Sequence, residues 1–109
     1  MSRISTHVLD TATGKPAPGI AVRLEAKSNG AWNALAEGAT DADGRVKTLA
    51  ESVAAGEYRI VFSIARYFSE RGRRSLYSEI AVTFVCDGEA HYHLPVLLSD
   101  NGYTTYRGS

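Results

Sequence analysis

Short segments in which apolar and polar residues alternate, separated by turn-forming residues, run along the whole chain. In one of them, Ile20, Val22 and Leu24 fall on one face, because successive side chains of a strand point to opposite sides. Eight such segments, with turns roughly every 8–12 residues, predict an all-β fold, an antiparallel sandwich or barrel. The expected strands cover residues 4–10, 20–26, 31–40, 45–49, 57–64, 78–85, 91–99 and 102–107.

One segment departs from this pattern. Residues 65–74 (ARYFSERGRR) have a helical composition that stops at Gly72, which predicts one short helix. With 109 residues the chain has the usual length of a single domain, so we expect one domain spanning residues 1–109. A deep pocket enclosed by one such chain is not expected.

The charge balance and the cysteine count exclude several classes of function. Twelve basic and twelve acidic side chains give a formal net charge of zero, so nucleic acid and anionic membrane surfaces are not expected partners. No stretch approaches the roughly 18 apolar residues of a membrane helix. The single cysteine, Cys86, is in phase with apolar residues and is expected to be a core thiol in a protein of the reducing cytoplasm.

All three histidines lie in two expected strands, on the face opposite the apolar residues. His91 and His93 alternate with an apolar set, and His7 does the same in the first strand. Solvated surface histidines are the simplest interpretation. Imidazole exchanges a proton near neutral pH, so two histidines that converge on one water could make it a nucleophile. Three neutral imidazoles could instead hold a catalytic zinc ion.

Other polar residues have simple structural interpretations. Residues 41–44 (DADG) lack the remaining ligands of a calcium loop and predict a β-turn, so Arg45 after them reads as a surface arginine. The arginines at 71, 73 and 74 are expected in a solvated turn, and Trp32 is equally consistent with packing and with recognition. The carboxylate of Ser109 lies beside Arg107, in a terminus that either frays or is used.

Three segments together resemble the 5-hydroxyisourate hydrolases of the transthyretin-like family. They are ISTHVLDTATGKPAPGI at residues 4–20, DGRVKTL at 43–49 and HYHLPVLLSDNGYTTYRGS at 91–109. The closing YRGS is the most specific piece, because it separates the hydrolases from the hormone-carrying transthyretins. The resemblance covers nearly the whole chain and implies a transthyretin-like sandwich of two four-stranded sheets with one short helix.

The resemblance also implies an activity. Members of the family open the ring of 5-hydroxyisourate with water, giving 2-oxo-4-hydroxy-4-carboxy-5-ureidoimidazoline in urate breakdown. They need no cofactor or metal, and they act as homotetramers, dimers of dimers whose sites lie in a channel between the dimers. Carried over residue by residue, the catalytic pair falls on His7 and His93 and the family's arginine on Arg45.

Physical roles follow for these residues. His7 and His93 would bind and deprotonate the attacking water, and Arg45 would pair with substrate oxygens and stabilise the developing charge. Ser109 would orient the water or a histidine, through its hydroxyl or its carboxylate. Tyr106 would limit the depth of the channel, where a smaller residue in a transthyretin leaves room for a hormone.

Two residues near these receive no catalytic role. His91 belongs to the same family motif without a role assigned to it, and Arg107 is expected to face away from Tyr106 on simple strand alternation.

Two other functions remain open: a non-catalytic carrier of small ligands, and a three-histidine zinc hydrolase.

Overall fold

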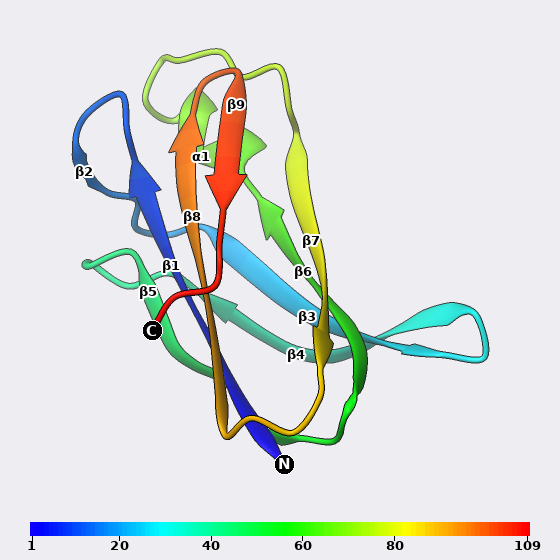
Figure 1. Ribbon diagram of the computed structural model, residues 1–109. Helices are drawn as coiled ribbons and strands as arrows, with labels where there is room; N and C mark the ends of the chain where they lie inside the picture. Colours follow the sequence, from blue (N-terminus) through cyan, green and yellow to red (C-terminus); the bar gives the residue numbers. More distant parts are fainter.

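The computed structural model describes residues 1–109 as two β-sheets packed face to face (Figure 1). The second sheet has the order β4-β3-β6-β7, and in the first, of order β2-β1-β8-β9, β5 also pairs with β1. The all-β sandwich with one short helix is confirmed. The first sheet has five strands because residues of the first turn form a two-residue strand, β2. The elements are β1 (Ser2–Asp10), β2 (Lys15–Pro16), β3 (Ala21–Ser28), β4 (Ala31–Ala39), β5 (Arg45–Val53), β6 (Gly56–Ser63), α1 (Ala65–Ser69), β7 (Glu79–Cys86), β8 (His91–Ser99) and β9 (Gly102–Thr105).

One strand pair runs in a direction that the sequence pattern did not predict. All neighbouring strands are antiparallel except β1 and β8, which are parallel, with Ser5 opposite His93 and His7 opposite Pro95. Alternation of side chains assigns a face to each residue, but it does not assign a direction to strands that are distant in sequence. The parallel pairing places the two histidine-bearing strands side by side.

The alternating apolar residues form the core between the sheets, as predicted. Twenty buried side chains make one cluster, which includes Ile4 from β1, Leu94 from β8 and Ile60 from β6. Cys86 is a buried free thiol within this cluster, in agreement with its expected position. Because the apolar faces point inward, the histidines of β1 and β8 lie on the outer face of the first sheet. No helix of the structure is long and apolar enough to cross a membrane.

The prediction of a solvated arginine cluster is wrong for Arg73. Its guanidinium is paired with Asp10, which is fully buried, at 2.5 Å, and with Asp100, also at 2.5 Å. The Tyr67 hydroxyl donates a further hydrogen bond to Asp10 at 2.8 Å. This network ties the segment after α1 to the end of β1 and to the β8–β9 turn, a long-range pairing that local composition does not reveal.

Trp32 lies half-buried on the second sheet, where it packs against a cation. The Arg59 guanidinium lies 4.5 Å from the centre of its ring, and Lys27 also faces it. Of the two interpretations of this residue, the structure supports packing.

The turn at residues 41–44 forms as expected and positions the start of β5. The Asp41 carboxylate accepts hydrogen bonds from the backbone N–H groups of Asp43 and Arg45, at 2.8 and 3.0 Å. Gly44 has φ +75°, and a Cβ there would collide with the Val8 carbonyl, so the chain passes β1 too closely for any other residue. The turn therefore holds Arg45 directly opposite His7.

Candidate active site

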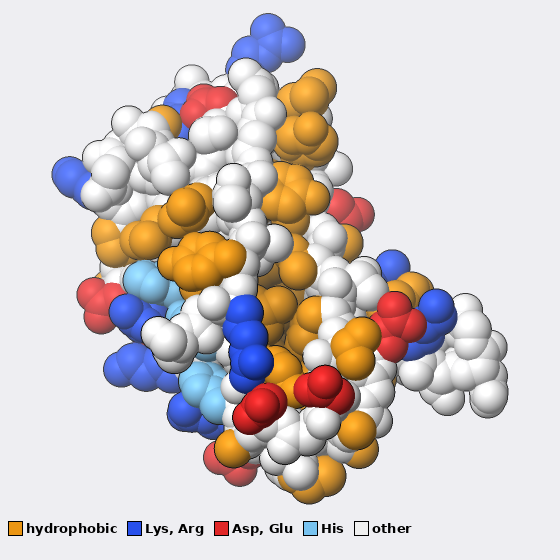
Figure 2. Space-filling model, in the orientation of Figure 1, with side chains coloured by type: hydrophobic (Ala, Val, Ile, Leu, Met, Phe, Trp, Pro, Cys, Tyr) orange, Lys and Arg blue, Asp and Glu red, His pale blue; other side chains and the backbone are white.

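A hollow of about 350 Å³ opens on the outer face of the first sheet, over β5, β1 and β8. Histidines and cations gather on this side of the molecule, beside the C-terminal segment (Figure 2). None of the eight lining residues has a hydrophobic or acidic side chain, so the hollow suits an electron-rich, oxygen-bearing ligand. The lining consists of Arg3, Ser5, Thr6, Arg45, Lys47, His91, His93 and Ser109.

Ser5 joins the two histidines of β8. Its hydroxyl oxygen lies 2.7 Å from Nδ1 of His93 and 2.6 Å from Nε2 of His91, and only 3% of the residue is exposed. The Arg3 guanidinium then reaches Nδ1 of His91 at 3.3 Å. Both imidazoles are therefore held in a fixed orientation at the floor of the hollow.

His7 stands next to the hollow and is anchored by the turn before β5. Its Nε2 lies 2.9 Å from the carbonyl oxygen of Asp43. Because a carbonyl only accepts, Nε2 of His7 carries the proton and donates this bond. Its register partner across the strands is Arg45, so the same turn fixes both residues.

The C-terminal segment closes one side of the site. The Gly108 amide donates a 2.7 Å hydrogen bond to the His93 carbonyl, and the two residues form an isolated bridge beyond the end of β9. This bridge brings the exposed Ser109 to the hollow.

Burial and neighbouring positive charge keep the β8 histidines neutral. Burial lowers the pKa of His93 below its ordinary value, and His91 and Arg45 lower it further. Burial and the charge of Arg3 likewise lower the pKa of His91. Both rings are therefore neutral at pH 7, the state in which imidazole can exchange a proton.

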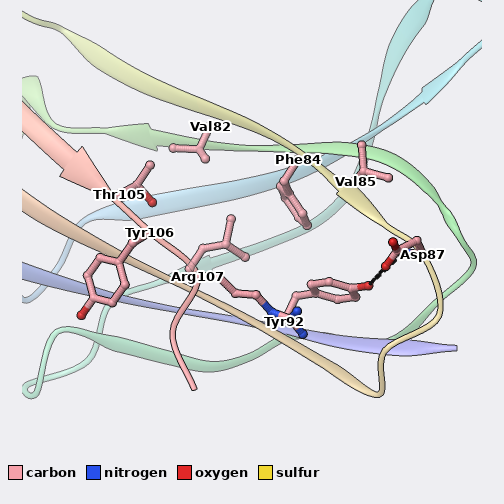
Figure 3. Close-up of a pocket in the computed structure, with 9 residues that line it drawn as sticks. Val82, Phe84, Val85, Asp87, Tyr92, Thr105, Tyr106 and Arg107 are labelled. Carbon is pink, nitrogen blue, oxygen red and sulfur yellow. Dashed lines mark hydrogen bonds between the residues drawn. The ribbon is translucent and has the colours of Figure 1, made fainter.

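The structure brings together three of the predicted site residues, Arg45, His93 and Ser109, with His7 beside them. Tyr106 lies elsewhere in this chain. It lines a second, mostly apolar hollow of about 380 Å³ between β7, β8 and the segment after β9, together with Phe84 and Tyr92 (Figure 3). In this chain Tyr106 does not border the histidine hollow.

Arg107 also borders that second hollow, and its side chain extends away from the Tyr106 ring, as expected (Figure 3). The strand β9 ends at Thr105 rather than at residue 107. The Arg107 guanidinium lies 4.7 Å from the centre of the Tyr92 ring, and one of its N–H groups reaches the His91 carbonyl at 3.4 Å.

Besides the buried Thr6, three lining residues were not singled out from the sequence: Arg3, Ser5 and Lys47. Strand periodicity contains the information that places them. Arg3 and Ser5 are in phase with His7, and Lys47 is in phase with Arg45. Periodicity does not show that these strands are neighbours.

The histidines are not gathered with other His, Cys, Asp or Glu side chains into a set of three or more that could hold a metal ion.

Comparison with known proteins places this chain and its fold in a family. The model of the HIUase/Transthyretin family matches residues 4–108. A 5-hydroxyisourate hydrolase of Salmonella dublin is 46% identical over 109 residues, which cover 97% of this chain and 80% of the relative. The chain therefore belongs to the HIUase/Transthyretin family. Within that family it is a hydrolase of the 5-hydroxyisourate hydrolase type, linked to urate and purine catabolism.

Solved structures share the fold across both branches of the family. The structure of Klebsiella pneumoniae 5-hydroxyisourate hydrolase matches with a TM-score of 0.90 and 39% identity, over 100% of both chains. Sea bream transthyretin in complex with thyroxine matches with a TM-score of 0.92 and 32% identity, over 97% of this chain and 94% of that one. Because both fit equally well, the backbone does not separate hydrolase from ligand-binding relative, and the side chains of the site carry that distinction.

Proposed function

We propose that this protein hydrolyses 5-hydroxyisourate to 2-oxo-4-hydroxy-4-carboxy-5-ureidoimidazoline, the step after urate oxidation in purine breakdown. The observation that carries the proposal is the juxtaposition of neutral His93 with Arg45 in a hollow without acidic side chains, next to His7. A cationic, polar hollow favours an oxygen-rich heterocycle over an apolar ligand. The relatives named 5-hydroxyisourate hydrolase support the same substrate.

The roles follow from the chemistry of each group. His7 and His93 bind and activate the attacking water, as general acid–base groups with no cofactor. Arg45 pairs with the substrate oxygen on which negative charge develops. Ser109 orients the water or a histidine, and Tyr106 limits the depth of the site in the assembled protein.

The assembly in this proposal is a homotetramer, a dimer of dimers with its sites between the dimers. In support, the hollow lies on the outer face of a sheet, and Arg45, Lys47 and Ser109 are exposed there in one chain. A second copy across this face would exclude water from the site and strengthen its electrostatics. Sedimentation equilibrium gives the mass of the assembly directly. We place the protein in the cytoplasm, where its free Cys86 thiol stays reduced.

The activity is tested by generating 5-hydroxyisourate from urate with urate oxidase and following the absorbance of the intermediate. Catalysis accelerates its decay in proportion to the protein added. Unchanged decay, combined with tight binding of an aromatic ligand, would instead identify a non-catalytic carrier.

Metal analysis and the same assay after chelation distinguish a three-histidine zinc hydrolase from the proposed metal-free hydrolase. The proposal expects full hydrolysis in the presence of chelator. Loss of activity that zinc restores would support a three-histidine metal site instead.

A further inference from the structure

A continuous chain of hydrogen bonds runs from the surface to His93. It links the guanidinium of Arg3 to Nδ1 of His91 (3.3 Å), Nε2 of His91 to the Ser5 hydroxyl (2.6 Å), and that hydroxyl to Nδ1 of His93 (2.7 Å). The parallel register supports it, since Arg3 pairs with His91 and Ser5 with His93 on adjacent strands. Because Ser5 is buried, its hydroxyl is shared between these two rings.

The Arg3 guanidinium determines which group donates and which accepts along this chain of hydrogen bonds. A guanidinium only donates hydrogen bonds, so Nδ1 of His91 must accept. A neutral imidazole that accepts at Nδ1 carries its proton on Nε2, and His91 therefore donates to the Ser5 oxygen. The single hydroxyl proton of Ser5 is then directed at Nδ1 of His93, which leaves the proton of His93 on its Nε2.

His7 has the same tautomer, but its other nitrogen is the one that is free. Its Nε2–H donates to the Asp43 carbonyl, and no other group of the chain forms a hydrogen bond with the ring. The lone pair of His7 is therefore on Nδ1. The two histidines of the site thus differ: His7 has a free acceptor nitrogen, and His93 has a free donor.

We propose that Ser5 is a positioning residue whose hydroxyl, directed by Arg3 through His91, holds His93 in the tautomer protonated on Nε2, so that His93 acts as proton donor and His7 as base. The catalytic part rests on the proposed function, whereas the tautomer does not. The lowered pKa values of His91 and His93 agree with this tautomer, because the chain of hydrogen bonds requires both rings to be neutral.

The proton transfers balance in this assignment. Water attacks the ring carbonyl carbon and gives one proton to Nδ1 of His7. The carbon–nitrogen bond of the ring breaks, its electron pair stays on nitrogen, and that nitrogen takes the Nε2 proton of His93. The His93 ring then carries a negative charge, opposite to the positive charge of protonated His7. Exchange with solvent returns the proton from His7 to His93, so the protein is unchanged after one turnover.

The tautomer is measured directly by long-range ¹H–¹⁵N NMR of labelled protein. The chain has only three histidines, and single His→Gln variants assign them. The expected spectrum shows His93 with a protonated Nε2 and an accepting Nδ1. A spectrum with the proton of His93 on Nδ1 would overturn the proposal, whatever the activity of the protein.

Arg3 offers a matched pair of variants because it is exposed, so its replacement leaves the fold intact. Arg3→Lys keeps a group that only donates, and His93 should keep its tautomer. Arg3→Met removes that donor, and His93 should become a mixture of both tautomers, while the exposed Lys15→Met has no effect. If the His93 tautomer is unchanged in Arg3→Met, Arg3 does not direct the hydrogen bonds to His93.

Steady-state kinetics then test whether the His93 tautomer contributes to catalysis. Ser5→Ala should lower kcat about 10- to 100-fold with KM almost unchanged, and Ser5→Thr, which restores a hydroxyl, should recover much of it. A Ser5→Ala protein with an altered His93 tautomer and normal kcat would contradict the catalytic part. If the wild-type protein shows the expected tautomers but does not hydrolyse 5-hydroxyisourate, the proposed function fails and the hydrogen-bond chain stands.

Discussion

The backbone of Gly108 lies directly against the imidazole of His93. The Gly108 amide donates a 2.7 Å hydrogen bond to the His93 carbonyl, and a Cβ at position 108 would lie 2.6 Å from Cδ2 of that imidazole. It would also lie 3.1 Å from the ring of Pro95. The glycine of the closing YRGS is therefore required by the packing of the C-terminal segment on the proposed active site.

Gly108→Ala tests this contact. The added methyl group must displace either the imidazole or the segment that carries Ser109, and a displacement of about 1 Å can cost on the order of 100-fold in rate. We expect kcat/KM for 5-hydroxyisourate to fall by that order while the thermal unfolding temperature changes little. Gly102→Ala is the control, because its Cβ would have only an ordinary contact, 3.6 Å from the Ser99 hydroxyl. Equal activity of the two variants would contradict the role given to this packing.

The titration of His93 provides a second prediction. Burial first, and then the positive neighbours including Arg45, lower its pKa, so His93 should gain its second proton only below the ordinary value of about 6.5. NMR titration of the ring protons measures this midpoint. Arg45→Gln removes one of the positive charges and should move the midpoint to higher pH. A midpoint above 6.5 in the wild-type protein would show that the imidazole is not buried among cations.

The ion pair between Asp10 and Arg73 predicts a pH-dependent stability. Burial raises the pKa of Asp10, but hydrogen bonds from Arg73 and Tyr67 outweigh this effect and leave it below its usual value. A carboxylate whose folded pKa is depressed stabilises the fold above its unfolded pKa of about 3.9, and that contribution is lost as the pH falls through the folded value. Asp10→Asn should therefore lower the free energy of unfolding by about 3 kcal/mol at pH 7.

Urea unfolding from pH 7 down to strongly acidic pH checks this prediction. The difference between the wild type and Asp10→Asn should shrink only below the usual aspartate range. Asp100→Asn is the control, since the side chain of Asp100 is 33% exposed and its pairing with Arg73 should contribute less than about 1 kcal/mol. A difference that does not depend on pH would mean that the charge of Asp10 is not the cause.

Alternation along the chain was sufficient to predict which side chains form the core and which face outward. The faces of His7 and His93 follow from local spacing alone, because successive side chains of a strand point to opposite sides. The β-turn before Arg45 was also predicted locally, from Asp41 and Gly44. These features depend on residues that are close in sequence.

The relations that define the site depend on which distant segments pair, and local patterns do not encode this. The parallel pairing of β1 with β8 brings Ser5 to His93, and the bridge to Gly108 brings Ser109 to the same hollow. The burial of Arg73 against Asp10 is a contact of the same kind. The resemblance to the hydrolases named Arg45, His93 and Ser109 of this hollow, but it did not give the contacts between segments.

The central claim is that His7 and His93 activate water toward 5-hydroxyisourate, and the coupled urate oxidase assay of His7→Ala and His93→Ala tests it most directly. One general acid–base group contributes at least about 100-fold to a rate, so each variant should lose at least that much turnover. Arg66→Ala, on the exposed face of α1, should match the wild type. Near-normal hydrolysis by both histidine variants would contradict the account.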